Sequence, residues 1–163
     1  MSEPLRLASA EQTEAAAECF AAAISALEPE QLCVHLDGQM GAGKTTFARG
    51  LLRALGHQGR VPSPTYTLVE PYECGGYRIY HMDLYRLQAG AELEFLGLDE
   101  MLGSGAILLI EWPERAADYL QTRDIEIKLK VIPEGRSLQL DACSAAGAEL
   151  ATEFSRRIAE QNP

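Results

Sequence analysis

Basic residues are scarce in this sequence, which has 14 Lys and Arg against 24 Asp and Glu, for a formal net charge of -10. Proteins that bind nucleic acid or anionic membranes directly use clustered positive charge. The imbalance therefore argues against broad electrostatic contact with either. It leaves open a role in RNA metabolism that is carried out through a basic partner protein.

Paired cysteines and long apolar runs are also missing. The four cysteines are scattered, without a CxxC pair or a Cys/His spacing typical of zinc, and this indicates reduced thiols. No apolar run approaches the ~20 residues that a membrane span needs. The first residues lack the basic and then apolar pattern of a signal peptide. We therefore expect a cytoplasmic protein that does not enter membranes, and a monomer rather than a homo-oligomer.

The 163 residues contain no repeat, low-complexity linker or composition shift, so we expect one domain spanning residues 1–163. Apolar periodicity and turn signals predict strands at 5–7, 32–36, 66–72, 77–82, 106–110, 125–131 and 137–140, and helices at 10–27, 45–55, 91–102 (broken), 113–120 and 147–158. This mixture predicts an α/β fold: a single P-loop NTPase-like domain with a mixed central sheet flanked by helices.

A glycine-rich motif of the form G-x-x-x-x-G-K-[ST] follows the second predicted strand and is met by Gly38, Gly43, Lys44 and Thr45. Glycines let backbone N–H groups point at phosphate oxygens, and the following helix adds its positive end. Lys44 is expected to face solvent until phosphate arrives and then to reach the β- and γ-phosphates, and the Thr45 hydroxyl to bind Mg²⁺. The motif predicts a site for ATP and Mg²⁺ that also uses Gly41, Ala42 and Thr46.

Two acidic residues, Asp83 and Glu111, directly follow strand-like runs. Carboxylates at the carboxyl ends of central strands lie where such sheets bind ligands. Glu111 follows a run that looks buried on both faces, so we expect its carboxylate near the Thr45 hydroxyl, sharing the Mg²⁺. Asp83 leads into residues 84–86, a segment expected to move. It is the candidate for positioning the attacking water, and with Lys44 it forms the predicted catalytic pair.

Other polar and aromatic residues admit more than one interpretation. Ser63 and Thr65, in a loop with two prolines, could sense the γ-phosphate as switch loops do, or serve ordinary turn chemistry. His81 could be a base, a partner contact or a strand residue, and its spacing from Asp83 places both on one face of a strand. Trp112 could belong to the core or cover the nucleotide.

Taken together, the motifs resemble those of the bacterial TsaE (YjeE) family over about residues 5 to 145. The similar segments are, in order, 38–46, 63–66, 81–86, 94–100 and 111–113. The resemblance implies a compact P-loop ATPase that acts with the TsaB–TsaD pair in forming threonylcarbamoyladenosine beside the tRNA anticodon. ATP hydrolysis would serve turnover of that complex, TsaD would carry out the transfer itself, and tRNA would be met only indirectly.

The family's functional positions map onto individual residues of this chain. Lys44 and Thr45 match its nucleotide and metal residues, Thr46 the second hydroxyl position, Asp83 the acid of its HxDxY motif, Glu111 its metal-site acid, and Trp112 the aromatic that follows. Thr13 resembles a position near the nucleotide. The chain departs from the family at two places. Gln39-Met40 replaces the commoner Asp-Leu at variable positions of the phosphate pattern, and Met82 stands where an aromatic is frequent.

Rival functions remain for the same phosphate loop. A small-molecule kinase usually needs an Arg-rich lid over the phosphates, and no basic insertion of that kind occurs here. A GTPase would use an Asn-Lys-x-Asp element to read the base, which is also missing. The sequence does not distinguish a slow ATPase from a nucleotide-gated adaptor that needs no hydrolysis.

Overall fold

The computed structural model describes residues 3–162, so that residues 1–2 and 163 of the predicted domain lie outside it. Within the described range the chain forms one seven-stranded sheet with the order β1-β7-β6-β2-β5-β4-β3. The α/β fold with a mixed sheet is confirmed. The strands are β1 (Leu5–Leu7), β2 (Leu32–Asp37), β3 (Val69–Cys74), β4 (Tyr77–Asp83), β5 (Ile107–Glu111), β6 (Ile125–Ile132) and β7 (Gly135–Ala142).

The centre of the sheet is parallel and its edges are antiparallel. Strand β2 pairs in parallel with β5 and β6, and β5 pairs in parallel with β4. The β3–β4 hairpin closes one edge, and β7 pairs antiparallel with β6 and β1 at the other. Strands β2 and β5 are buried almost throughout, as the unbroken apolar runs predict. The carboxyl ends of β2, β5 and β4 lie side by side at the same end of the strands, and this end of the sheet carries the site described below.

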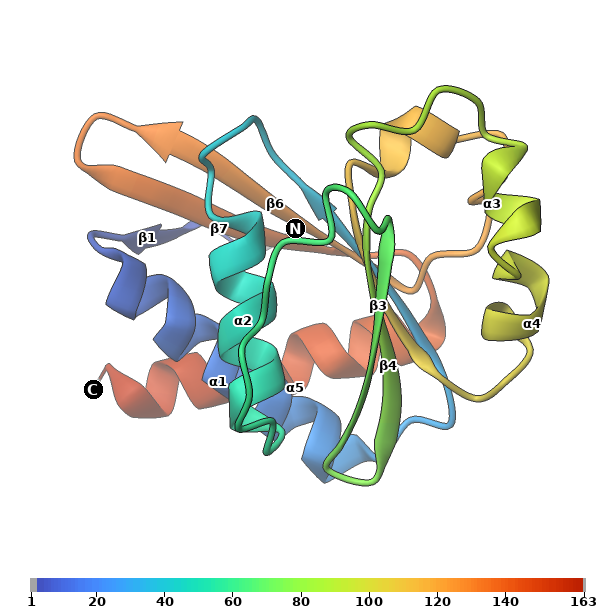
Figure 1. The fold of residues 1–163 in the computed structure, drawn as a ribbon. Helices are drawn as coiled ribbons and strands as arrows, with labels where there is room; N and C mark the ends of the chain where they lie inside the picture. The colour runs from blue at the N-terminus through green and yellow to red at the C-terminus, as the bar shows by residue number, and fades with distance from the viewer. Residues whose placement is uncertain (1–2, 163) are drawn as a thin grey trace.

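Helices cover both faces of the sheet and create two cores (Figure 1). On one face lie α1 (Ala10–Leu27), α2 (Lys44–Ala54) and α5 (Ala145–Gln161), whose apolar sides meet around Phe20, Phe47 and Phe154. The aromatic rings of Phe47 and Phe154 both pack edge-on against Phe20. On the other face lie the short α3 (Glu92–Phe95), α4 (Leu98–Leu102) and the 3-10 turn η1 (Pro113–Ala116). This second core contains fewer buried residues than the first.

Several predicted boundaries move. The strand expected at 66–72 begins at Val69, because residues before it form a turn closed by a hydrogen bond from Leu68 N–H to Pro64 O, with Leu68 at φ 66°. The helix expected over 113–120 ends at Ala116 as a single 3-10 turn. Strand β7 is longer than 137–140, because it pairs along the whole of β6. Within residues 3–162 no helix combines the length and hydropathy needed to cross a membrane.

Candidate functional site

The glycine-rich loop joins the end of β2 to the start of α2, directly at the edge where the parallel strands end. Gly41 (φ 79°) and Gly43 (φ 107°) adopt left-handed conformations that favour glycine. A Cβ at Gly38 would lie 2.5 Å from the carbonyl oxygen of Leu129, so only glycine lets the loop pack this closely on β6. The loop is thus shaped by its glycines into a tight turn at the amino end of a helix.

Lys44 is the first residue of α2, and its side chain is buried, with 5% exposure. Its ammonium group donates to the carbonyl oxygens of Gly38 and, at 3.0 Å, Gln39, and lies 4.1 Å from the centre of the Trp112 ring. The expectation that Lys44 faces solvent was therefore wrong. The physical reason is that the loop's own carbonyls and an indole face supply a ready site for the cation.

Burial is the largest influence on Lys44 and lowers the pKa of its ammonium group. Nearby carboxylates, first Glu111 and then Asp83, act in the opposite direction. The ammonium is therefore held in a place where an anion could pair with it at close range and low dielectric.

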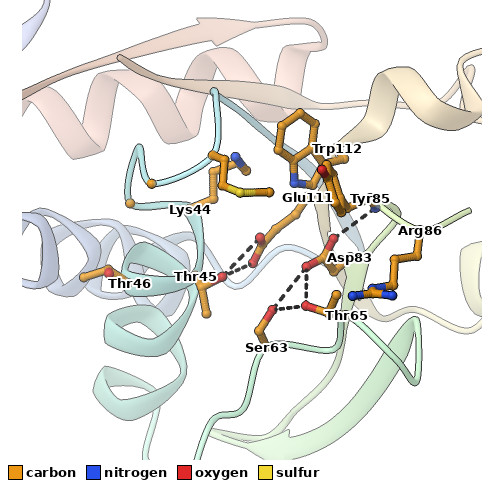
Figure 2. A pocket seen from close by; sticks show the side chains of 13 residues that line it. Lys44, Thr45, Thr46, Ser63, Thr65, Asp83, Tyr85, Arg86, Glu111 and Trp112 are labelled. Carbon is orange, nitrogen blue, oxygen red and sulfur yellow. Dashed lines mark hydrogen bonds between the residues drawn. The ribbon is translucent and has the colours of Figure 1, made fainter. Parts of the chain in front are cut away.

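Thr45 and Glu111 are in direct contact across the site (Figure 2). The Thr45 hydroxyl donates to the Glu111 carboxylate, with Oγ1 lying 3.0 Å from Oε1 and 3.2 Å from Oε2. The expected proximity of these two groups is confirmed. Glu111 is the last residue of β5 and is 2% exposed. Its position follows from the register, because Glu111 is paired with Leu36 of β2 next to the phosphate loop.

His81 contacts the Glu111 carboxylate from the neighbouring strand β4. Its Nε2 lies 2.7 Å from Oε1 of Glu111, and the imidazole is fully buried on β4. A side chain without exposure cannot contact a partner protein, so that interpretation of His81 is wrong. The contact fixes the orientation of the Glu111 carboxylate, while the interpretations of His81 as a base or as an ordinary strand residue stay open.

Asp83 ends β4 beside Glu111 on β5, and these two residues are register partners. It is 4% exposed. Its Oδ2 accepts hydrogen bonds from the Ser63 hydroxyl at 3.1 Å and the Thr65 hydroxyl at 3.3 Å, while its Oδ1 accepts from the Tyr85 N–H at 3.0 Å. Asp83 therefore ties the loop containing Ser63 and Thr65 to the edge of the sheet, and both hydroxyls face the site (Figure 2).

Trp112 directly follows Glu111 and turns the chain out of β5, with a left-handed φ of 57°. Its indole lies over Lys44 and, with ring centroids 5.0 Å apart, beside Tyr85. Trp112 is partly buried against the second core and also lines the first cavity, so both earlier alternatives, a core residue and a cover for the nucleotide, stay open.

Two cavities adjoin the phosphate loop. The first has a volume of about 370 Å³, and its wall contains the predicted residues Gly41, Gly43, Lys44, Thr45, Thr46, Ser63, Thr65, Asp83, Glu111 and Trp112. The second, about 280 Å³, lies on the other side of the loop and contains the predicted Thr13 together with Gly41, Gly43 and Thr46. Gly38 and Ala42 line neither cavity. The remaining predicted site residues are thus brought together, although their roles stay predictions.

Residues to which the sequence assigned no role also contribute. Tyr85 and Arg86 line the first cavity. Arg136, just after the β6–β7 turn, lines the second, and its Nη2 donates to the carbonyl oxygen of Gly41 at 2.9 Å. Arg86 belongs to the motif 81–86 and could have been proposed from it. Arg136 carries no sequence signal, because it reaches the loop from 95 residues away.

Comparison with known proteins agrees with this geometry. The family model for "Threonylcarbamoyl adenosine biosynthesis protein TsaE" matches residues 7–138. The tRNA threonylcarbamoyladenosine biosynthesis protein TsaE of Haemophilus influenzae is 43% identical over 137 residues, which are 83% of this chain and 87% of that protein. The protein of the same name from Rickettsia bellii is 40% identical over 133 residues, with 81% and 89% covered.

A solved structure shows the same fold. The crystal structure of YdiB from Bacillus subtilis superposes with a TM-score of 0.78 at 31% identity, covering 97% of this chain and 98% of that one. The matched region contains the phosphate loop, the 81–86 motif and the Glu111-Trp112 pair. The chain therefore belongs to the TsaE family of tRNA threonylcarbamoyladenosine biosynthesis proteins.

Proposed function

We propose that this chain binds ATP with Mg²⁺ and hydrolyses it in a partner-dependent way, in support of a TsaB–TsaD complex that modifies tRNA beside the anticodon in the cytoplasm. The observation that carries the proposal is the direct contact between the Thr45 hydroxyl and the Glu111 carboxylate beside a phosphate loop. A hydroxyl and a strand-end carboxylate placed together in this way are the protein groups that hold the metal in P-loop NTPases.

The donor set fits Mg²⁺. Thr45 and Glu111 offer oxygen atoms, and residues 3–162 contain no group of three or more His, Cys, Asp or Glu that would form a complete protein cage for a metal. Mg²⁺ usually keeps several waters and is held by one or two carboxylates together with substrate phosphates. When bound, it would neutralise charge on the β- and γ-phosphates. His81 would keep the Glu111 carboxylate turned toward it.

The two cavities suit the two ends of a nucleotide. The first contains the ammonium of Lys44 and the two acids, and so suits the phosphates. The second contains Thr13, Thr46 and Arg136 on the other side of the loop, and we assign it to the ribose and adenine. On binding, Lys44 would exchange the loop carbonyls of Gly38 and Gln39 for phosphate oxygens, which form stronger charge-assisted hydrogen bonds.

Asp83 is the proposed group for positioning the attacking water. The Ser63 and Thr65 hydroxyls lie 2.8 Å apart and within reach of the Asp83 carboxylate, so their two hydrogens are used within this trio and their remaining lone pairs can accept a hydrogen bond from a water. The contacts of the loop that carries them would then depend on whether a γ-phosphate is present. Partner contact with this loop would make hydrolysis depend on the partner, because a small change in water position alters the rate strongly.

Protein partners, rather than RNA, are the proposed contacts of this chain. A net charge of -10 opposes direct binding to tRNA. We propose that the chain is a monomer until it joins the TsaB–TsaD complex and meets tRNA only through it.

Phosphate release from ATP labelled at the γ-position tests the proposal. We expect slow release by the chain alone and faster release with TsaB–TsaD. Transfer of the label to a small acceptor would instead identify a kinase, and nucleotide binding without any release, with or without partners, would identify an adaptor. Either result would refute the ATPase assignment.

A further inference from the structure

Arg86 is a basic residue in the cavity wall without a carboxylate partner. It lines the first cavity together with Ser63, Thr65 and Asp83, and Lys44 is the other basic residue of that wall. Among the carboxylates of residues 3–162, none lies within 4.0 Å of the Arg86 guanidinium. Other arginines of the described residues also lack a carboxylate partner, but Arg86 is the arginine that lines the phosphate cavity, and this position is what suggests a function.

Hydrogen bonds hold the backbone around Arg86, in the segment 84–86 that the sequence suggested would move. The flanking Leu84 and Leu87 are buried, and the Leu87 N–H donates to Leu84 O at 3.0 Å. The turn is also tied to both acids of the site. The Leu84 N–H donates to the Glu111 carbonyl at 3.1 Å, and the Tyr85 N–H donates to the Asp83 carboxylate at 3.0 Å. A backbone held in this way lets the arginine side chain reach a ligand without a large conformational change of the chain.

The Arg86 guanidinium rests on Tyr66. It lies 4.4 Å from the centre of the Tyr66 ring, and its Nη2 donates to the Tyr66 hydroxyl at 3.3 Å. Tyr66 is 82% exposed, and a cation–π contact in so much water is weak. Phosphate oxygens offer shorter, charge-assisted and bidentate hydrogen bonds, so they would compete well for the guanidinium. Figure 2 shows this group turned toward the side of the pocket that carries Thr65 and Asp83, away from Lys44.

We propose that Arg86 is a catalytic residue that supplies, from within the same chain, the positive charge that stabilises the transferred phosphoryl group. The inference rests on the proposed ATP hydrolysis. In that reaction water forms the new P–O bond, the bond to the β-phosphate oxygen breaks with its electron pair left on ADP, and the proton of water ends on the released phosphate or in solvent. Arg86 gains and loses no proton. It neutralises charge on the equatorial oxygens from the side opposite Lys44.

Three variants separate this role from a structural one. Arg86→Ala removes the charge, and Arg86→Lys keeps the charge but loses the planar fork. Arg115→Ala is the matched control, because Arg115 also stacks on a tyrosine, 5.3 Å from the Tyr85 ring centre, yet does not line the cavity. For each we would measure ATP affinity, single-turnover hydrolysis with the partner proteins, and affinity for ADP with aluminium fluoride, which imitates the planar phosphoryl group. Circular dichroism checks the fold.

For Arg86→Ala we expect ATP affinity within about threefold of wild type, since a group acting in the transition state alters turnover rather than binding. Hydrolysis should fall by about 10³-fold, and affinity for ADP–aluminium fluoride should fall with it. Arg86→Lys should recover only a small part of both, and Arg115→Ala should behave as wild type. Wild-type hydrolysis by a folded Arg86→Ala protein would overturn the role of Arg86 and leave the ATPase assignment intact. Equal losses in Arg86→Ala and Arg115→Ala would also overturn it, whereas absence of hydrolysis in wild type would overturn both proposals.

Discussion

Replacing Lys44 by Met separates the function of this lysine from its unexpected burial. Methionine keeps a stem of similar length and loses the ammonium group. In the free protein that ammonium donates to Gly38 and Gln39, while burial lowers its pKa and so opposes the charged form. Loss of these hydrogen bonds lowers the free energy of unfolding, whereas removal of a buried charge raises it. We therefore expect the free energy of unfolding of Lys44→Met to stay within about 1–2 kcal/mol of wild type.

Lys44→Ala provides the comparison that gives the magnitude. It lacks three further heavy atoms of a stem that is almost fully buried. At about 0.8 kcal/mol for each buried methylene, it should be about 2 kcal/mol less stable than Lys44→Met. For a chain of this size that difference lowers Tm by about 4–8 °C. Both variants lose the charge-assisted hydrogen bonds to phosphate, worth about 1.5–3 kcal/mol, and so about 10- to 150-fold in ATP affinity.

Thermal unfolding with and without Mg²⁺ and ATP measures both effects, because a ligand that binds the native state raises Tm by mass action. Calorimetric titration then gives the affinities. Wild-type ATP affinity in folded Lys44→Met would refute the assignment of the phosphate loop. Equal Tm values for the Met and Ala variants would refute the structural part of the reasoning, namely that the lysine stem contributes to packing.

Other predictions concern the acids, the base and a buried histidine. Glu111→Gln should weaken Mg²⁺-dependent nucleotide binding by about 10- to 100-fold. Asp83→Asn should leave binding nearly unchanged and slow single-turnover hydrolysis by about 10²-fold or more; the opposite pattern in Mg²⁺ titrations would reverse the two roles. ATP should raise Tm more than GTP at equal concentrations with Mg²⁺, and an equal or larger shift with GTP would count against the adenine assignment. Burial, with a smaller contribution from Arg123, lowers the pKa of His35 from 6.5 to about 4. Between these two pH values the unfolded chain binds more protons than the folded chain. The free energy of unfolding of wild type should therefore fall, relative to that of His35→Leu, by up to about 3 kcal/mol as pH falls from about 6.5 to about 4. Urea unfolding at several pH values measures this difference. Parallel pH profiles of the two proteins would contradict this, and would show that the charged residues lining a cavity beside His35 (Asp37, Glu114, Arg123 and Glu126) offset the effect of burial.

Features encoded by short stretches of sequence were predictable. The phosphate loop has a fixed spacing of glycines, and the unbroken apolar runs before Gly38 and Glu111 identify buried parallel strands. Because the carboxyl ends of such strands meet at one edge, the proximity of Glu111 to Thr45 followed from the pattern. The predicted start of strand β3 was too early, because the turn before it places Leu68 in the left-handed conformation and no glycine in the sequence indicates such a turn.

Features that depend on long-range packing were not predictable. The burial of Lys44 requires the Trp112 ring, which comes from a different strand end. The link from Asp83 to Ser63 and Thr65 joins residues about 20 positions apart, and composition gave no reason to prefer it over ordinary turn chemistry. Arg136 reaches the Gly41 carbonyl from β7, a strand 95 positions further along the chain. Each of these contacts is decided by the sheet order rather than by a local motif.

The number of tRNA molecules modified by each TsaB–TsaD complex is the most direct test of the account. The measurement would supply tRNA, threonylcarbamoyl donor and ATP in excess, and compare wild-type chain with folded Lys44→Met. We predict many modified tRNA molecules per complex with wild type, and about one or fewer with Lys44→Met, since ATP hydrolysis is proposed to reset the complex between rounds. Equal numbers with the two proteins would contradict the proposal that ATP turnover by this chain drives the cycle.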